Sequence, residues 1–379
     1  MKKILSLILL SVLFSCQQPA EKAKVPYTKA DFETTIMGKK VSLFHLQNAN
    51  GMEVYLTNYG AKLVSILVPD KEGKYDDVIL GFKSIKEYEV NDPSQGAIVG
   101  PYANRIANAK FDLNGTTYNL EVNNHKANLH SGSSSFYRQV YDARQIKTAD
   151  GSAIELSIKS PDGACGFPGN KNVKVTYTLK NDNSLAINYE ITTDKPCPFN
   201  MTNHSYFNLK GEGNGNIEDQ LLMIDADSTT EVLDNELIPT GKIISIKGTD
   251  MDFTTPFIVG KRINSDFLPI KVAGGYDHNF ILNKDQNGHE MTLAASDYDQ
   301  ESGRFMEVYT TEPAIQVYTG NFLDGTLTGK SGKKYGHRYG ICFETQHYPD
   351  SPNHPNFPNT ILNPGETLHS TTIFKFSVK

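Results

Sequence analysis

"VKVTYTL" at residues 173–179 and "LAINYEI" at residues 185–191 carry the pattern that indicates the fold class. In both, apolar side chains occupy every second position, from Val173 to Leu179 and from Leu185 to Ile191. Successive side chains of a β-strand point to opposite faces, so a period of two is typical of a strand with one buried face. The pattern predicts sheets that are packed on one side and leave the other side available for packing or binding.

The same alternation recurs at "FMEVYT" (305–310), "AIQVYTG" (314–320) and "TIFKFSV" (372–378). Asn-Gly and Asp-Gly pairs between such runs tolerate the positive φ of tight hairpin turns, and "FDLNGTTYNL" (111–120) is the clearest hairpin. Helical patterning is scarce, with "SIKEYE" (84–89) as the best candidate. No linker or internal repeat divides the chain. We therefore predict an all-β protein, one large antiparallel β-sandwich with few short helices.

Composition excludes some classes of protein. Of the 379 residues, 38% are hydrophobic and 21% are charged, which is typical of a globular protein and not of a disordered one. The formal net charge is −6, and the Lys and Arg residues are dispersed. A nucleic-acid partner is therefore not expected, because such proteins concentrate positive charge on one surface.

The N-terminus "MKKILSLILLSVLFSC" has a basic start, an apolar run and a small residue before Cys16. This outline predicts a signal peptide over residues 1–15. "LFSC" resembles the lipobox of bacterial lipoproteins, in which cleavage precedes a cysteine that then carries lipid. The expectation is a lipidated Cys16, a polar tether over 16–29 and a domain over 30–379, exported and anchored to a bacterial membrane, facing the periplasm. A plain signal peptide cut elsewhere is the alternative.

The remaining cysteines, Cys165, Cys197 and Cys342, have neither the number of a disulfide framework nor the spacing of a zinc site, and we expect free thiols. "GEGNGN" lacks the glycine spacing of a phosphate-binding loop, so no nucleotide cofactor is indicated. "SDYDQESG" resembles the start of a calcium loop, but its glycine falls one position late. Its acidic residues are interpreted as a solvated turn; they are Asp297, Asp299 and Glu301.

A histidine lies in the polar stretch "MTNHSYFNL", residues 201–209. If this stretch is one strand, His204 shares a face with Thr202, Tyr206 and Asn208. Taken alone, such a histidine is more often a hydrogen-bonded buried residue than a catalyst. A metal ligand is a weaker interpretation, because no other histidine has ligand spacing around it.

A second stretch, "ICFETQHYPDSPNHPNFPNT" (341–360), begins as a strand on which Cys342, Glu344 and Gln346 share a face. It then becomes a loop, since its prolines cannot continue a ladder of hydrogen bonds. A glutamate at this position is a plausible general base, although a lone glutamate is more often a surface carboxylate.

Two further clusters carry polar groups that suit hydroxyl recognition. "GPYANRIAN" (100–108) contains Asn104 and Arg105, and "GGYDHNF" (274–280) sets Asp277 after two flexible glycines. Each cluster is weak evidence by itself.

Together these segments resemble the aldose 1-epimerases, also called galactose mutarotases. "GPYANRIA", "NNHKANLHSG", "TNHSYFNL", "GGYDHNF" and "CFETQHYPDSPNHPNFP" occur in the family's order, and the resemblance extends from about residue 30 to the C-terminus. It implies the galactose mutarotase-like supersandwich fold. One departure is Ser131, where the family often has glycine, and this affects the expected shape of the local loop.

The resemblance also implies roles for particular residues. His204 corresponds to the general acid and Glu344 to the general base. Tyr206 is expected to line the pocket. The residues that correspond to the groups that hold the sugar are Asn104, Arg105, His130 and Asp277.

The implied activity is interconversion of the α and β anomers of free aldohexoses such as D-glucose and D-galactose, by ring opening, rotation about C1–C2 and reclosure. No cofactor or metal is required, although a bound Ca²⁺ is compatible with the sequence, and a monomer is expected. At ordinary pKa values of about 4.3 for glutamate and 6.5 for histidine, the pair is expected to need little tuning.

Two other functions remain open at this stage. A glycoside hydrolase could use Asp277 and Glu344 as its pair of carboxylates. A non-catalytic sugar-binding lipoprotein is the alternative from another class, with Tyr and Phe as platforms in a chain that has no Trp.

Overall fold

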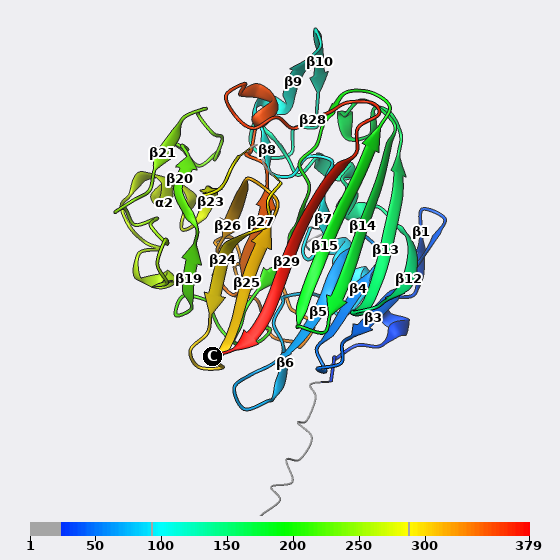
Figure 1. The fold of residues 1–379 in the computed structure, drawn as a ribbon, viewed down its shortest axis with the longest axis vertical. Coiled ribbons are helices and arrows are strands. Elements are labelled where there is room, and N and C mark those ends of the chain that lie inside the picture. Colours follow the sequence, from blue (N-terminus) through cyan, green and yellow to red (C-terminus); the bar gives the residue numbers. More distant parts are fainter. Residues whose placement is uncertain (1–23, 92–93, 287–288) are drawn as a thin grey trace, which may run out of the picture.

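A nine-stranded antiparallel sheet forms the largest layer of the computed structural model, which describes residues 24–91, 94–286 and 289–379 (Figure 1). Its strands, in spatial order, are β12 (Asp142–Thr148), β13 (Gly151–Ser160), β14 (Lys171–Lys180), β15 (Ser184–Thr193), β29 (Leu368–Val378), β25 (Arg304–Thr310), β24 (Thr292–Tyr298), β19 (Leu221–Ile224) and β22 (Phe257–Ile258).

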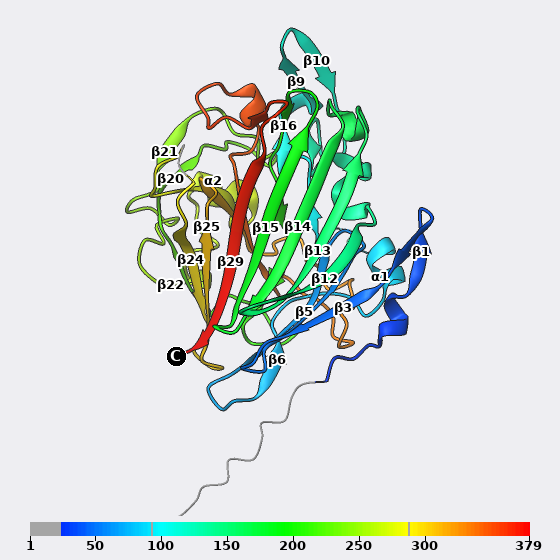
Figure 2. The ribbon, with the colours of Figure 1, turned by 45° about the vertical axis from the view of Figure 1, so that its right-hand side comes forward.

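The alternating runs at residues 173–179 and 185–191 lie in β14 and β15, which are side by side in this sheet (Figure 2). Val175 is opposite Tyr189 and Tyr177 is opposite Ile187, and all four side chains are buried. The predicted alternation is confirmed, because it brings the apolar residues of both strands to the same face.

A six-stranded sheet packs its apolar face against the nine-stranded sheet. Phe280, Val317 and Phe343 of this sheet belong to the same core cluster as Val175 and Phe374 of the larger one. The order of its strands is β18 (Tyr206–Phe207), β27 (Ile341–Gln346), β26 (Ala314–Tyr318), β23 (Asp277–Leu282), β20 (Ala226–Thr230) and β21 (Ile243–Ser245).

The other face of the six-stranded sheet is polar. Glu344 on β27 is opposite Gln316 on β26, and Tyr318 on β26 is opposite Asp277 on β23. Because side chains alternate along each strand, the residues between these positions enter the core and these four turn away from it. This polar face carries the site described below.

The remaining strands form a four-stranded sheet and several pairs. The four-stranded sheet adds residues such as Val54 and Ile66 to the main core. Its strands are β3 (Leu43–Gln47), β4 (Glu53–Thr57), β5 (Lys62–Pro69) and β6 (Tyr75–Asp77). The pairs are β1 (Thr34–Ile36) with β2 (Lys39–Val41), β7 (Ile98–Val99) with β17 (Thr202–Asn203), β8 (Arg105–Ile106) with β11 (Asn128–Leu129), β9 (Lys110–Leu113) with β10 (Thr116–Asn119), and β16 (Cys197–Pro198) with β28 (Ile361–Leu362).

Helices are short, as predicted. The expected helix is α1 (Ile85–Val90), where the Ser84 side chain accepts a hydrogen bond from the Glu87 N–H. A second helix, α2 (Leu268–Ala273), was not predicted. The 3₁₀ turns are η1 (Lys29–Phe32), η2 (Ala107–Ala109), η3 (Gly132–Ser134), η4 (Phe136–Arg138), η5 (Ala164–Gly166), η6 (Val259–Lys261) and η7 (Ser351–Asn353). Within the described ranges, no helix has the length and apolar character needed to cross a membrane.

The predicted signal peptide and Cys16 lie outside the described residues. Closer to the domain, Tyr27 is buried: its hydroxyl donates to Ser65 Oγ at 2.6 Å and its ring meets the edge of Phe32. The packed part of the chain therefore begins a few residues before residue 30.

The solvated turn predicted around the acidic residues is wrong for two of the three. Asp297, at the end of β24, and Asp299 are buried, and only Glu301 is exposed. Asp299 accepts a hydrogen bond from the Ser302 N–H in the turn that leads into β25, which brings this segment beneath the surface. Burial raises the pKa of Asp297, and the neighbouring Asp299 adds to this. Elsewhere in the described ranges, Cys165, Cys197 and Cys342 are thiols that form no disulfide, as expected.

Candidate active site

One cavity of about 260 Å³ lies over the polar face of the six-stranded sheet. It brings together all seven residues that the sequence suggested for catalysis or sugar binding: Asn104, Arg105, His130, His204, Tyr206, Asp277 and Glu344. They come from β8 and the residue before it, the segment after β11, the segment between β17 and β18, and strands β18, β23 and β27. Larger hollows elsewhere have volumes of about 360, 450 and 540 Å³, and none of these three is lined by any of the seven residues. Convergence of polar groups, and not volume, distinguishes this cavity.

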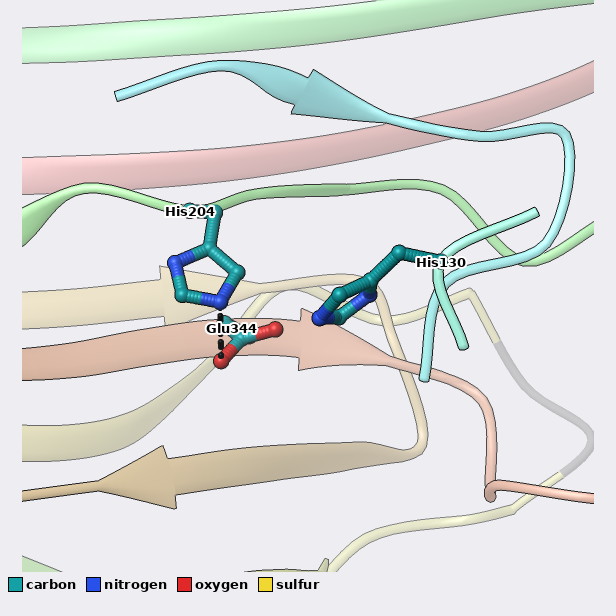
Figure 3. A group of neighbouring side chains, drawn as sticks. All are labelled: His130, His204 and Glu344. Atoms are coloured by element: carbon teal, nitrogen blue, oxygen red, sulfur yellow. Dashed lines mark ion pairs between the residues drawn. The ribbon is translucent and has the colours of Figure 1, made fainter. Parts of the chain in front are cut away.

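His204 and Glu344 face each other (Figure 3), and both line the cavity. His204 Nε2 lies 3.6 Å from Glu344 Oε1, and both side chains are almost fully buried. The two groups form an ion pair when the imidazole is protonated. Both are close enough to serve neighbouring atoms of one small ligand.

The predicted strand over 201–209 is interrupted at His204. Thr202–Asn203 pairs with β7, whereas Tyr206–Phe207 pairs with β27. At the crossover the His204 N–H donates to the Ala97 carbonyl at 2.9 Å, so the main chain stays fixed although it changes partner. The prediction of one continuous strand is wrong, because this segment connects two sheets.

Of the residues expected to share a polar face with His204, Tyr206 lines the cavity with it and Asn208 does not. The rings of His204 and Tyr206 lie 5.2 Å apart and both line the cavity. Asn208 instead donates hydrogen bonds to the carbonyls of Gly215 and Tyr339. It therefore has a structural role outside the site.

Burial raises the pKa of Glu344 to about 7, and the charge of Asp277 adds to this effect, while His204 and Arg105 oppose it. The expectation that the pair needs little tuning is therefore wrong for the glutamate. Its Oε2 atom has no hydrogen-bond partner among the residues that the structure describes. This oxygen is available to a ligand in the cavity.

His130 is held in one tautomer by the main chain of Asn104. The main-chain N–H of Asn104 donates to the ring atom Nδ1 of His130 at 3.0 Å. In return, the main-chain N–H of His130 donates to the Asn104 carbonyl at 3.0 Å. Because Nδ1 accepts, the proton of the neutral ring is on Nε2. Burial lowers the pKa of His130 well below its ordinary value, and His204 and Arg105 lower it further. His130 therefore presents a neutral N–H donor to the cavity.

The residues expected to hold the sugar form a connected group. Arg105 Nη2 lies 3.6 Å from Asp277 Oδ2, and Arg105 Nη1 donates to Asn104 Oδ1 at 3.4 Å. Gln316 donates to Asp277 Oδ1 at 2.6 Å. Buried charged and amide groups of this kind recognise hydroxyls with strict geometry.

Three residues of the cavity could instead be considered as ligands of a metal ion. Ligand atoms of His130, His204 and Glu344 lie within 4.8 Å of one another. A metal needs an imidazole lone pair, but Nδ1 of His130 already accepts the Asn104 N–H and Nε2 carries the proton. The donor set therefore fits proton transfer better than metal binding.

Several residues of the site were not singled out from the sequence. Gln316 orients Asp277, and five more residues line the cavity: Ser94, Asn124, Leu129, Tyr318 and Phe322. The alternation of "AIQVYTG" assigns Gln316 and Tyr318 to one face of a strand. The alternation does not reveal which strands lie beside this one. Gln316 and Tyr318 are part of the site because of the register of β26 with β23 and β27.

Ser131, the departure from the family pattern, has a left-handed backbone with φ of 64°. This explains why glycine is common there. Its hydroxyl donates to the Tyr102 carbonyl and accepts from the Tyr102 N–H, at 2.9 and 2.8 Å. These two bonds hold the loop that carries His130.

The chain is similar in sequence and fold to known proteins. The family described as Aldose 1-epimerase matches residues 42–375. Galactose mutarotase of Sus scrofa is 42% identical over 338 residues, covering 89% of this chain and 94% of the relative. Aldose 1-epimerase of Escherichia coli (strain K12) is 37% identical over 341 residues, covering 89% of this chain and 96% of the relative. The crystal structure of galactose 1-epimerase from Lactobacillus acidophilus superimposes with a TM-score of 0.80 at 29% identity, covering 91% of this chain and 97% of that one.

Proposed function

The chain belongs to the aldose 1-epimerase family and is an isomerase that interconverts anomers, and from this premise we propose that His204 and Glu344 transfer the two protons of the reaction. The observation that carries the proposal is the 3.6 Å approach of His204 Nε2 to Glu344 Oε1 inside one cavity. The proposed substrates are free aldohexoses, D-glucose and D-galactose among them.

Ring opening needs one proton to leave the C1 hydroxyl oxygen and another to arrive at the ring oxygen. The C1 hydroxyl gives its proton to the Glu344 carboxylate, the protonated His204 gives its Nε2 proton to the ring oxygen, and the C1–O5 bond breaks to leave an aldehyde. Both oxygens are bonded to C1, so the acid and the base must lie close together. The short His204–Glu344 distance supports this arrangement.

The anomer changes in the open form. Rotation about C1–C2 presents the other face of the carbonyl, and the C5 hydroxyl then adds to it while His204 takes back its proton and Glu344 returns the other. The enzyme ends in its initial protonation state, and nothing is oxidised or reduced.

The raised pKa of Glu344 matters for the energy of the open form. Ring opening in effect moves a proton from imidazolium to carboxylate by way of the sugar. An ordinary glutamate, with a pKa of about 4.3, binds that proton weakly. Burial raises the pKa of Glu344 to about 7, so this carboxyl holds the proton more readily and the open form is less costly to reach.

The other residues of the cavity are proposed to hold the sugar. Asn104, Arg105 and Asp277 offer an amide, a guanidinium and a carboxylate for its hydroxyls, and the His130 Nε2–H offers a neutral donor. Tyr206 lines the pocket beside His204. Loss of one hydrogen bond to a charged group is expected to cost about 1.5–3 kcal/mol of binding.

Polarimetry tests the function. Freshly dissolved α-D-glucose or α-D-galactose should approach anomeric equilibrium faster with the protein than without it. An unchanged rate together with measurable sugar binding would instead indicate a binding module. Sugar release from a synthetic glycoside, abolished by Glu344→Gln, would indicate a hydrolase. The relatives described above are epimerases and mutarotases, which supports neither alternative.

No cofactor is required in this proposal, because His204 and Glu344 account for both protons. Dialysis against EDTA should leave activity unchanged. Loss of activity that is restored by Ca²⁺ would show that a bound cation is needed. We also propose that the protein acts as a monomer, which sedimentation equilibrium would test.

The N-terminal pattern supports a further proposal about location: Cys16 carries lipid and anchors the protein to a bacterial membrane, facing the periplasm. Radiolabelled palmitate should be incorporated into the wild type and not into Cys16→Ala. Equal labelling of both would contradict the anchor.

A further inference from the structure

Asn200 lies at the meeting point of three segments that carry site residues. It is 2% exposed and lies between β16 and β17, four residues before His204. Asn200 does not line the cavity. Its hydrogen bonds nevertheless reach the segments of Arg105 and Glu344.

The side chain of Asn200 pairs with the peptide of His347. Its Oδ1 accepts from the His347 N–H at 2.8 Å, and its Nδ2 donates to the His347 carbonyl at 3.2 Å. β27 ends one residue earlier, at Gln346. The carboxamide therefore continues the pairing of this strand, three residues after Glu344, with the two bonds that a neighbouring strand would make.

The same residue bonds to the segment that leads into Asn104 and Arg105. The Asn200 N–H donates to the Pro101 carbonyl at 2.9 Å, and the Asn200 carbonyl accepts from the Ala103 N–H at 2.5 Å. Its Nδ2 also donates to the Ala103 carbonyl at 3.3 Å. One amide group thus contacts the main chain beside the sugar-holding residues and beside the base.

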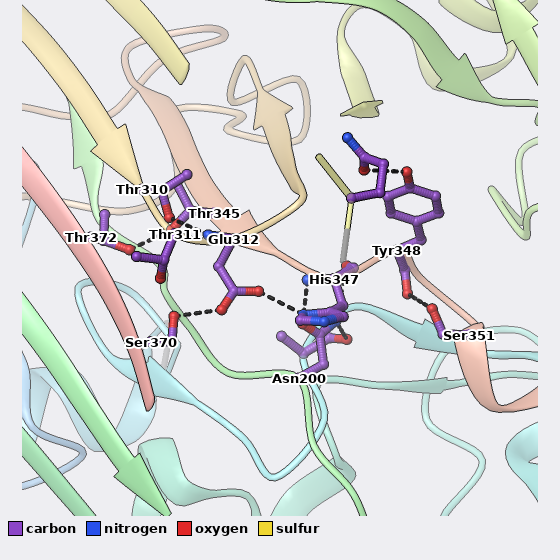
Figure 4. A network of polar contacts seen from close by, with 12 residues as sticks. Asn200, Thr310, Thr311, Glu312, Thr345, His347, Tyr348, Ser351, Ser370 and Thr372 are labelled. Atoms are coloured by element: carbon purple, nitrogen blue, oxygen red, sulfur yellow. Dashed lines mark hydrogen bonds and ion pairs between the residues drawn. The ribbon is translucent and has the colours of Figure 1, made fainter. Parts of the chain in front are cut away.

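His347 is anchored from its other side as well (Figure 4). Its Nδ1 lies 2.7 Å from Glu312 Oε2, and Glu312 Oε1 accepts from the Ser370 hydroxyl on β29 of the nine-stranded sheet. The His347 residue whose peptide pairs with Asn200 is therefore connected to the largest sheet. Asn200 in turn hydrogen-bonds the segment before Arg105 to this anchored position.

We propose that Asn200 is a positioning residue that sets the sugar-holding segment relative to the Glu344 carboxylate. This inference rests on the proposed roles of Arg105 and Glu344. Tyr102 and Asp350 also connect the two segments, through the Tyr348 and Arg105 carbonyls. Removal of Asn200 should therefore displace the sugar slightly and leave the cavity intact. Misplacement by about 1 Å costs a reaction about 100-fold in rate.

Asn58 offers a matched control. It is 4% exposed, its Oδ1 accepts from the Ser42 N–H at 2.8 Å, and its Nδ2 donates to two carbonyls, those of Lys40 at 2.9 Å and Tyr141 at 2.8 Å. The main-chain carbonyl of Asn58 accepts a hydrogen bond from the Tyr141 N–H. In the same way, the main-chain carbonyl of Asn200 accepts one from the Ala103 N–H. The side-chain bonds are of the same kind and number, but none of these residues lines the cavity.

The experiment compares Asn200→Asp with Asn58→Asp in the full chain, with polarimetry for activity and circular dichroism for the Tm. Each change replaces two N–H donors by a carboxylate oxygen that faces carbonyls, so both variants should lose similar thermal stability. Asn200→Asp should lower kcat about 10–100-fold with little change in KM, whereas Asn58→Asp should keep the wild-type kcat.

The pH dependence gives a readout that a loss of stability alone would not move. A buried carboxyl that faces carbonyls binds a proton readily, and its O–H then restores one donor. The ratio of Asn200→Asp activity to wild-type activity should therefore rise as the pH is lowered from 8 to 6. A constant ratio, or equal loss of kcat in both variants, would overturn the proposal.

If Asn200→Asp does not fold, Asn200→Ala with Asn58→Ala replaces the pair, since alanine leaves the main-chain bonds in place and buries no charge. A wild-type kcat in a folded Asn200→Ala would also overturn the positioning role. Absence of activity in the wild type would overturn the proposed function instead, so the two failures are distinguishable.

Discussion

His204 Nε2 lies 3.6 Å from Glu344 Oε1, and the pairing of Tyr206 with Cys342 holds the two side chains at this distance. Each member of that strand pair lies two residues from the catalytic residue on its own segment. The acid and the base are thus positioned by main-chain hydrogen bonds and not by a flexible loop. This relationship determines most of what can be tested.

Glu344→Gln removes the base, and His204→Asn removes the acid. Each change should lower kcat about 10²–10⁴-fold in polarimetric assays, the range typical of a single acid–base group. Because burial raises the pKa of Glu344, its ionised form costs folding free energy, and Glu344→Gln should not lower the Tm.

Glu190→Gln provides the control, since Glu190 lies on β15 and pairs with Lys174 far from the cavity. It should keep wild-type activity. Normal activity in Glu344→Gln would assign the base to another residue.

The pH dependence of kcat/KM should follow the protonation of Glu344. Below about 7 this carboxylate binds a proton and can no longer accept the one from C1, so kcat/KM should fall about tenfold per pH unit on the acid side. The measured pKa belongs to the His204–Glu344 pair as a whole.

Asp277→Asn checks the electrostatic origin of that pKa. The charge of Asp277 adds to the effect of burial in raising the pKa of Glu344, so its removal should move the acid limb to lower pH. The measurement is the pH at which kcat/KM falls on the acid side. The size of kcat/KM is not used, because sugar binding also weakens in Asp277→Asn. An acid limb that stays in place would show that Asp277 has no electrostatic effect on the base.

His130 should remain neutral, with its proton on Nε2, throughout the working pH range. Burial lowers its pKa, and the Asn104 N–H occupies Nδ1. Nitrogen-15 NMR of the imidazole should show this tautomer at pH 6. A doubly protonated ring at that pH would contradict the donor role, and a proton on Nδ1 would reopen the question of metal binding.

Acid should weaken the fold through Glu312. Burial alone raises the pKa of this carboxyl, but His347 and the Ser370 hydroxyl together hold it below its ordinary value. A lowered folded-state pKa means that the stabilisation is fully present above the unfolded value, about 4.3, and is lost as the pH falls through the folded value.

Urea unfolding of the wild type and Glu312→Gln measures this contribution. The variant should be less stable by about 1.5–3 kcal/mol at pH 7, the value of hydrogen bonds to a charged group. The difference should shrink as the pH approaches 3. A difference that is constant across this range would show that the charge of Glu312 does not stabilise the fold.

Local pattern was enough to predict strands β14 and β15, the hairpin of β9 and β10, and helix α1, because period, turn residues and caps act over a few neighbouring positions. It failed at residues 201–209, where the strand changes partner in the middle, and at Asp297, which was expected in solvent. Both errors concern the position of a segment relative to distant ones.

Residue types, strand alternation and the motifs that contain His204 and Glu344 can all be read along the chain. Folding alone places Gln316 opposite Glu344 and in contact with Asp277, holds His130 in one tautomer through Asn104, and raises the pKa of Glu344 by burial. Strand register and desolvation arise from contacts between segments far apart in the chain, and local sequence does not encode them.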